Sequence, residues 1–186
     1  MFDPADRLLF LSALRREFPS KGLNVYHSDV GVGRKSAHDQ ASFAMLVSID
    51  GPDLAISVGY CGALDPALNV GDVVTASEVL DPEGRTRPAE PIGGAGVRFL
   101  TVDKMVTTAA DKAELFRSSG AAVVEMEASA VAEACAEEGV RFAAVKVVTD
   151  AAGDDLPPDS IRFSNWPPGR SEPRSAASPR SADDRR

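Results

Sequence analysis

The amino-acid sequence predicts a single-domain, three-layer α/β/α fold with a mixed, mostly parallel central sheet. Short apolar runs typical of buried strands alternate along the chain with segments of helical spacing. Such alternation is typical of right-handed crossovers between parallel strands. The length of 186 residues suits one domain, and the apolar fraction of 44% is that of an ordinary globular protein.

The expected elements follow one another at regular intervals. Strands are expected over residues 8–11, 23–27, 54–58, 72–79, 121–124 and 142–148. Helices are expected over residues 34–46, 107–116 and 128–138, the last with Gly139 as its C-cap. A glycine loop should join the second strand to the first helix, and the Pro/Gly-rich residues 81–96 should form a surface loop. Ligands of such sheets bind beyond the carboxyl ends of the strands.

The end of the chain differs in composition from the rest. Residues 162–186 contain six Arg, five Ser, four Pro and no Lys. This composition offers few apolar groups to bury and is typical of disorder. We therefore expect a domain over residues 1–160 and a disordered tail over 161–186. The change is abrupt, so one hypothesis is that the native reading frame ends shortly before the tail, which sequencing the gene with its neighbours would test.

Charge and cysteine content exclude several classes of function. A formal charge of -8 argues against binding to nucleic acid or to an anionic membrane, although a small anionic substrate stays open. Cys61 and Cys135 are isolated, and with His27 and His38 they supply no metal-ligand set. We therefore expect no metal and no cofactor. No apolar run reaches the ~20 residues of a membrane span, and no signal peptide is indicated, which predicts a cytoplasmic protein.

Glycines follow one expected strand in residues 58–66. Gly59 and Gly62 lack side chains, which would let a ligand approach the backbone and its N–H donors. A glycine turn at this place is also common for purely structural reasons.

Acidic residues end two further strands. Glu125 and Glu127 flank Met126 at a helix start, and a carboxylate can accept both hydroxyl protons of a vicinal diol such as that of ribose. Compensation of the helix dipole is the alternative. Asp150 ends the last strand, where partial desolvation would suit it to donate a proton, or where it would simply cap a turn. Because one strand–helix–strand unit separates Glu127 from Asp150, both should lie at the same sheet edge.

Together these segments resemble the nucleoside phosphorylase superfamily, in particular its methylthioadenosine/S-adenosylhomocysteine nucleosidase branch. The glycine block is similar to the family's sugar-site turn, residues 125–128 resemble its ribose-binding motif, and Thr149-Asp150 resembles its Ser-Asp pair. Residues 12–17 resemble its first strand and loop, and residues 31–35 its early glycine loop. The resemblance covers roughly residues 8–157 and implies a phosphorylase-like fold.

The resemblance implies cleavage of the N-glycosidic bond of a purine-type nucleoside by water, in nucleoside catabolism and methionine salvage, by a homodimer. Asp150 would protonate or hydrogen-bond the purine N7, and Glu17 would orient or deprotonate the attacking water. The transition state would resemble an oxocarbenium ion and be stabilised by placed charges. The implied substrate-binding residues are Glu127, Met126, Glu125, Thr149, Gly59, Tyr60, Gly62 and Met105.

Departures from the family pattern leave alternatives open. Tyr60 stands where the family usually has a small residue. Only about a dozen residues separate Glu17 from Gly31, a shortening similar to a compact subgroup that includes the hopanoid-associated phosphorylases. The tail shows no counterpart of the family's closing C-terminal helix, so the chain resembles a truncated member. An inactive family member that serves as a binding or structural subunit is therefore one alternative.

Phosphorolysis is the other alternative to hydrolysis. It needs a phosphate pocket, which normally contains arginines near the glycine turns. Ser57 stands where one branch of the phosphorylases has an arginine, whereas Gly33 and Arg34 remain candidate phosphate ligands. Arg34 would otherwise be a solvated helix residue. We therefore expect water to be the nucleophile.

Overall fold

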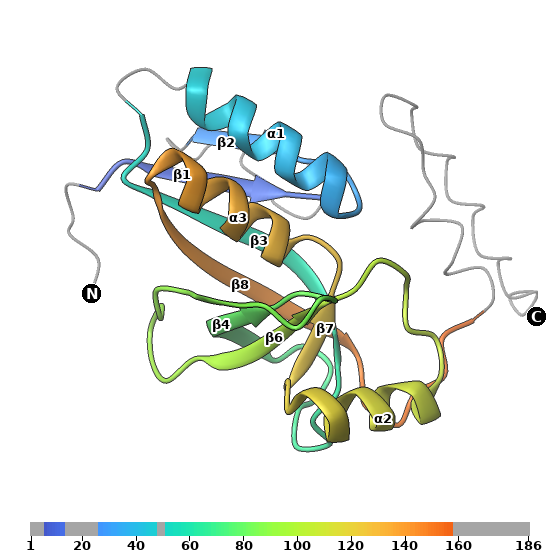
Figure 1. The fold of residues 1–186 in the computed structure, drawn as a ribbon. Helices are drawn as coiled ribbons and strands as arrows, with labels where there is room; N and C mark the ends of the chain where they lie inside the picture. The colour runs from blue at the N-terminus through green and yellow to red at the C-terminus, as the bar shows by residue number, and fades with distance from the viewer. Residues whose placement is uncertain (1–5, 14–25, 48–50, 158–186) are drawn as a thin grey trace, which may run out of the picture.

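The computed structural model describes residues 6–13, 26–47 and 51–157, which form a sheet flanked by helices (Figure 1). The strands are β1 (Leu8–Ser12), β2 (Tyr26–Asp29), β3 (Leu54–Ala63), β4 (Val73–Leu80), β5 (Thr86–Pro88), β6 (Val97–Thr101), β7 (Val123–Glu125) and β8 (Arg141–Asp150). The helices are α1 (Arg34–Val47), α2 (Ala109–Ser119) and α3 (Ala128–Glu138). None of the helices in this part of the chain is long and apolar enough to cross a membrane.

The strands form one mixed sheet in the order β2-β1-β3-β7-β6-β4-β5, with β8 joining β3 to β4. Pairs β3–β7, β4–β5 and β4–β8 are antiparallel, and the other five pairs are parallel. The pairings of β3, β7, β6, β4 and β8 close into a ring. The sheet is therefore mixed and mostly parallel, as the sequence predicts.

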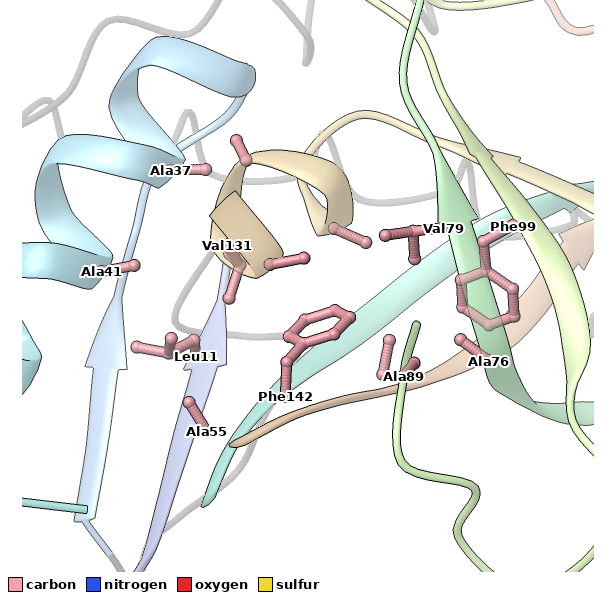
Figure 2. Packing of buried hydrophobic residues seen from close by; sticks show 14 of the residues in the cluster. Leu11, Ala37, Ala41, Ala55, Ala76, Val79, Ala89, Phe99, Val131 and Phe142 are labelled. Carbon is pink, nitrogen blue, oxygen red and sulfur yellow. The ribbon is translucent and has the colours of Figure 1, made fainter. Parts of the chain in front are cut away.

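Helices cover opposite faces of the sheet. α1 and α3 lie side by side, and their small residues Ala41 and Val131 pack near Leu11 and Phe142 in the main core (Figure 2). α2 packs on a second cluster that includes Leu100. Successive side chains of β6 thus point to different clusters, as a pleated strand requires, so α2 lies on the face opposite α3.

The helix predictions match the structure closely, whereas several strand predictions need correction. α3 has the predicted bounds, and Gly139 caps it in the left-handed conformation with φ 70°. The strand expected over residues 54–58 does not end at Gly59, because its backbone goes on pairing with β8 as far as Gly62 and with β7 at Ala63. The residues read as a glycine turn are therefore largely strand.

Two strands escaped the sequence prediction. β6 was not expected, and β5 lies within residues 81–96, which were expected to be loop. β5 is only three residues long and pairs with β4 through a tight turn, in which Asp81 accepts a hydrogen bond from the Arg85 N–H. The tail predicted over residues 161–186 and the start of the strand expected over residues 23–27 lie outside the described residues.

Candidate functional site

The carboxyl end of β3 brings two predicted site segments together. Gly62 pairs with Val124 of β7 on one side and with Asp150 of β8 on the other, directly after a register shift between Cys61 and Gly62. The chain leaves β7 through Met126 and enters α3 at Glu127. The segment with the two glutamates and the strand end with Asp150 thus flank the same residue of β3.

Gly62 is needed here for a close approach of side chain to backbone. A Cβ atom on Gly62 would lie 2.8 Å from Oδ2 of Asp150, which is closer than real Cβ contacts allow. The sequence indicated that glycine would leave room for a ligand. In the structure its missing side chain leaves room for the carboxylate of Asp150.

Asp150 is held by a buried lysine that the sequence interpretation overlooked. Lys112 of α2 has no exposed surface, and its Nζ donates to Oδ2 of Asp150 at 2.5 Å. The Asp150 side chain remains 13% exposed. On the other side, the hydroxyl of Thr149 lies 3.0 Å from Oδ1 of Asp150 and 3.2 Å from the carbonyl oxygen of Cys61. Asp150 is therefore a carboxylate with a donor at each oxygen and some access to solvent.

A signal for Lys112 was present in the sequence. Leu115 and Phe116 follow it by three and four positions, so all three residues lie on one face of α2. Both hydrophobic residues pack against the core. A lysine on the apolar face of a helix is unusual and indicates a buried partner.

Glu127 lies at the start of α3 and contacts the glycine loop that precedes α1. Its Oε1 accepts a hydrogen bond of 2.9 Å from the backbone N–H of Gly33, whose φ is 89°. The residue is buried to 7% exposure. Two segments that the resemblance assigned to the site, the glycine loop and the acidic motif, are thus in direct contact, although 94 positions separate these two residues.

Both carboxylate oxygens of Glu125 accept hydrogen bonds from groups inside the protein. Its Oε1 accepts from the Thr101 hydroxyl at 2.5 Å, and its Oε2 accepts from the backbone N–H groups of Glu127 and Ala128 at 3.0 and 2.7 Å. The ammonium of Lys146 lies 3.5 Å from the same Oε2. The Glu125 side chain is 1% exposed, so the structure gives it the role of neutralising the N-terminus of α3 and Lys146.

Arg34, a candidate phosphate ligand, is already paired with acids. Its guanidinium donates to both carboxylate oxygens of Glu83 at 3.0 and 2.9 Å and lies 3.5 Å from Asp103. The hydrogen bond with Glu83 raises the pKa of Arg34 and lowers the pKa of Glu83. Two carboxylates at one guanidinium compete with a phosphate for it.

The family model of the phosphorylase superfamily matches residues 20–100 and 95–165, well over half of the chain. The chain belongs to the phosphorylase superfamily. This result confirms the family predicted from the sequence motifs.

Relatives of this superfamily member carry nucleosidase names. A 5′-methylthioadenosine/S-adenosylhomocysteine nucleosidase of Anoxybacillus flavithermus is 25% identical over 166 residues, which cover 72% of this chain and 71% of the relative. Among solved structures, the nucleosidase of that name from Campylobacter jejuni matches with a TM-score of 0.71 and 17% identity, over 86% of this chain and 92% of its own. The one from Colwellia psychrerythraea 34H, solved with adenine, has a TM-score of 0.66 and 19% identity, over 86% of both chains. The shared fold confirms the predicted fold class.

The remaining positions predicted from the superfamily are less closely tied to Asp150. Tyr60 is 46% exposed on β3, opposite Val147 of β8, whereas Gly59 beside it is buried. Met105 lies partly buried in the loop between β6 and α2. Glu17 lies outside the described residues. No group of His, Cys, Asp or Glu side chains within the described ranges could hold a metal ion.

Proposed function

We propose that this protein hydrolyses the N-glycosidic bond of a purine-type nucleoside such as 5′-methylthioadenosine or S-adenosylhomocysteine. The observation that carries the proposal is the placement of Asp150 at the carboxyl end of β8. Asp150 pairs with Gly62 of β3 on one side, and β7, which leads into Glu127, pairs with Gly62 on the other. The superfamily membership and the names of the relatives support the same reaction.

Asp150 acts on the leaving base. Cleavage leaves the bonding electron pair on the base, so a proton or a hydrogen bond at the purine N7 makes the base a better leaving group. Thr149 beside it helps to hold the carboxylate. Glu17 orients or deprotonates the water that attacks the anomeric carbon.

Glu127 binds the ribose hydroxyls. A carboxylate can accept from both the 2′ and 3′ hydroxyls, and the hydrogen bond from Gly33 holds this one in place. Met126, which is partly exposed, packs against the sugar, and Tyr60 and Met105 border the site. Glu125 contributes indirectly, because its contacts hold the turn that presents Glu127.

Water is the nucleophile rather than phosphate. Phosphorolysis would require a cation at the glycine loop, and Arg34 there is neutralised by Glu83 and Asp103. The proposal includes a cytoplasmic location. It also includes a homodimer, carried over from the superfamily, which sedimentation at micromolar concentration would test.

The test is an assay of the purified protein on methylthioadenosine, S-adenosylhomocysteine and inosine, with and without phosphate. We expect free base and free sugar from at least one nucleoside, at the same rate in both conditions. Asp150→Asn should lower turnover by about 10²- to 10⁴-fold, whereas Glu114→Gln, on the exposed side of α2, serves as the matched control. Cleavage that requires phosphate would refute hydrolysis, and no cleavage of any purine nucleoside would refute the proposed function.

A further inference from the structure

Lys112 is fully buried, which is rare for a lysine. A fully buried ammonium is costly unless every proton has a partner. Its three protons match three acceptors, namely Oδ2 of Asp150 at 2.5 Å, the carbonyl oxygen of Ala151 at 2.8 Å and that of Asp154 at 3.0 Å. All three acceptors lie at or directly after the end of β8. Lys112 therefore contacts one short segment of chain and fixes both its backbone and the side chain of Asp150.

The helix that carries Lys112 is itself fixed to the same segment. The N–H of Ala109 donates to Asp155 at 2.8 Å, and the N–H of Leu156 donates to the Thr107 carbonyl at 2.8 Å. Thr108 caps the helix at this end. The start of α2 and residues 151–156 thus form one connected unit around the Lys112 ammonium.

We propose that Lys112 is the positioning residue for Asp150, an inference that rests on the proposed function. The ammonium holds Oδ2 in one place, so the carboxyl group meets the base in a single orientation. The remaining positions of the Asp150 carboxyl group, whose side chain is 13% exposed, are left for the base, either to carry the proton that goes to N7 or to accept from an N–H of the base. Lys112 is buried behind the carboxylate, so it acts through Asp150 and not on the substrate.

A purely structural ion pair would behave differently from a positioning one. If Lys112 only stabilised the fold, its loss would lower the melting temperature and leave the turnover of the folded protein unchanged. If it positions Asp150, its loss lowers kcat much more than it raises KM. Because the effect passes through Asp150, it should also vanish when Asp150 cannot act.

The experiment compares Lys112→Met, Lys112→Arg, Asp150→Asn and the Lys112→Met/Asp150→Asn double variant with the full wild-type chain. The exposed Arg117 on the same helix, 69% accessible, gives the matched control Arg117→Met. We expect Lys112→Met to lower kcat about 100-fold, the cost of a misplaced catalytic group, with KM changed less than about threefold. Lys112→Arg should recover at least about tenfold of that loss, because it restores a donor to Oδ2.

The double variant makes the inference falsifiable even if Lys112→Met folds poorly. It removes both buried charges together, so it should melt no lower than Asp150→Asn, and its residual turnover should match that of Asp150→Asn within about twofold. Turnover of folded Lys112→Met equal to wild type would overturn the inference. So would a further loss in the double variant, or a folded Lys112→Arg no more active than Lys112→Met. Each of these results leaves the proposed function standing, whereas an inactive wild type overturns both.

Discussion

Residues 6–13, 26–47 and 51–157 include two buried lysine–carboxylate pairs, which differ in how far the carboxylate is exposed to solvent. In one pair Lys146 lies 3.5 Å from Glu125, whose side chain is 1% exposed and accepts three further hydrogen bonds. In the other, Lys112 lies 2.5 Å from Asp150, which is 13% exposed and, among the described residues, has Thr149 as its one further donor.

The exposure of the carboxylate separates a structural acid from a candidate catalytic one. Both carboxylates end strands of the same sheet, and both have a lysine that neutralises them. Glu125 accepts three hydrogen bonds and has almost no surface left for a ligand, whereas Asp150 accepts two and keeps access to solvent. The comparison predicts that changes at Asp150 lower turnover, whereas changes at Glu125 lower stability and leave the turnover of the folded protein largely unchanged.

The largest expected effect is on turnover, from Asp150→Asn. The amide keeps the size of the side chain but removes the acid, so kcat should fall by about 10²- to 10⁴-fold. The chain should stay folded, but its melting temperature should fall, because the buried Lys112 ammonium loses its charged partner and keeps only its two carbonyl acceptors. Steady-state kinetics and a thermal melt check both parts, and unchanged turnover would remove Asp150 from the mechanism.

Glu125→Gln should instead lower stability and leave the turnover of the folded protein largely unchanged. It breaks the buried pair with Lys146 and leaves that charge uncompensated, which costs about 3–5 kcal/mol of unfolding free energy. Urea unfolding measures the loss, with Glu138→Gln at the exposed end of α3 as the control. A stable variant with strongly reduced turnover would mean that Glu125 belongs to the catalytic machinery after all.

Gly62→Ala should have a smaller effect, on turnover. The new Cβ would lie 2.8 Å from Oδ2 of Asp150 and displace the carboxylate from Lys112. We expect kcat to fall about 10-fold, less than for loss of the acid itself. Gly153→Ala is the control, because its Cβ would meet nothing within 4 Å. Equal kcat values for the two variants would show that Asp150 tolerates the shift.

The smallest expected effect is on the reactivity of the Cys61 thiol, which lies on β3 near both pairs. Burial raises the pKa of its thiol to about 12, so the folded protein keeps it protonated and slow to react with iodoacetamide at about pH 8. Because the folded-state pKa is raised, this stabilising contribution is complete below the unfolded pKa and is lost as pH rises toward about 12. Mass spectrometry should show faster alkylation in Glu125→Gln than in the exposed control Glu138→Gln. Equal rates would contradict the assignment of the stability role to Glu125.

The sequence by itself was sufficient for features that depend on neighbouring residues. The bounds of α3 and its Gly139 cap, the mixed α/β class, and the presence of acids at the ends of β7 and β8 all follow from local spacing and from strand–helix alternation. The family, too, followed from short motifs. Hydrophobic periodicity and capping act over a few residues, so they can be read along the chain.

Contacts between distant segments set which acid is sealed inside the protein and which keeps access to solvent. Lys112 and Asp150 are 38 positions apart, and no local pattern pairs them. Likewise, the extension of β3 past Gly59 depends on β8, and the burial of Glu125 depends on Thr101 and Lys146. Exposure and ion pairing are set by how distant segments pack together, and a carboxylate that looks the same in sequence becomes structural or functional according to its neighbours in space.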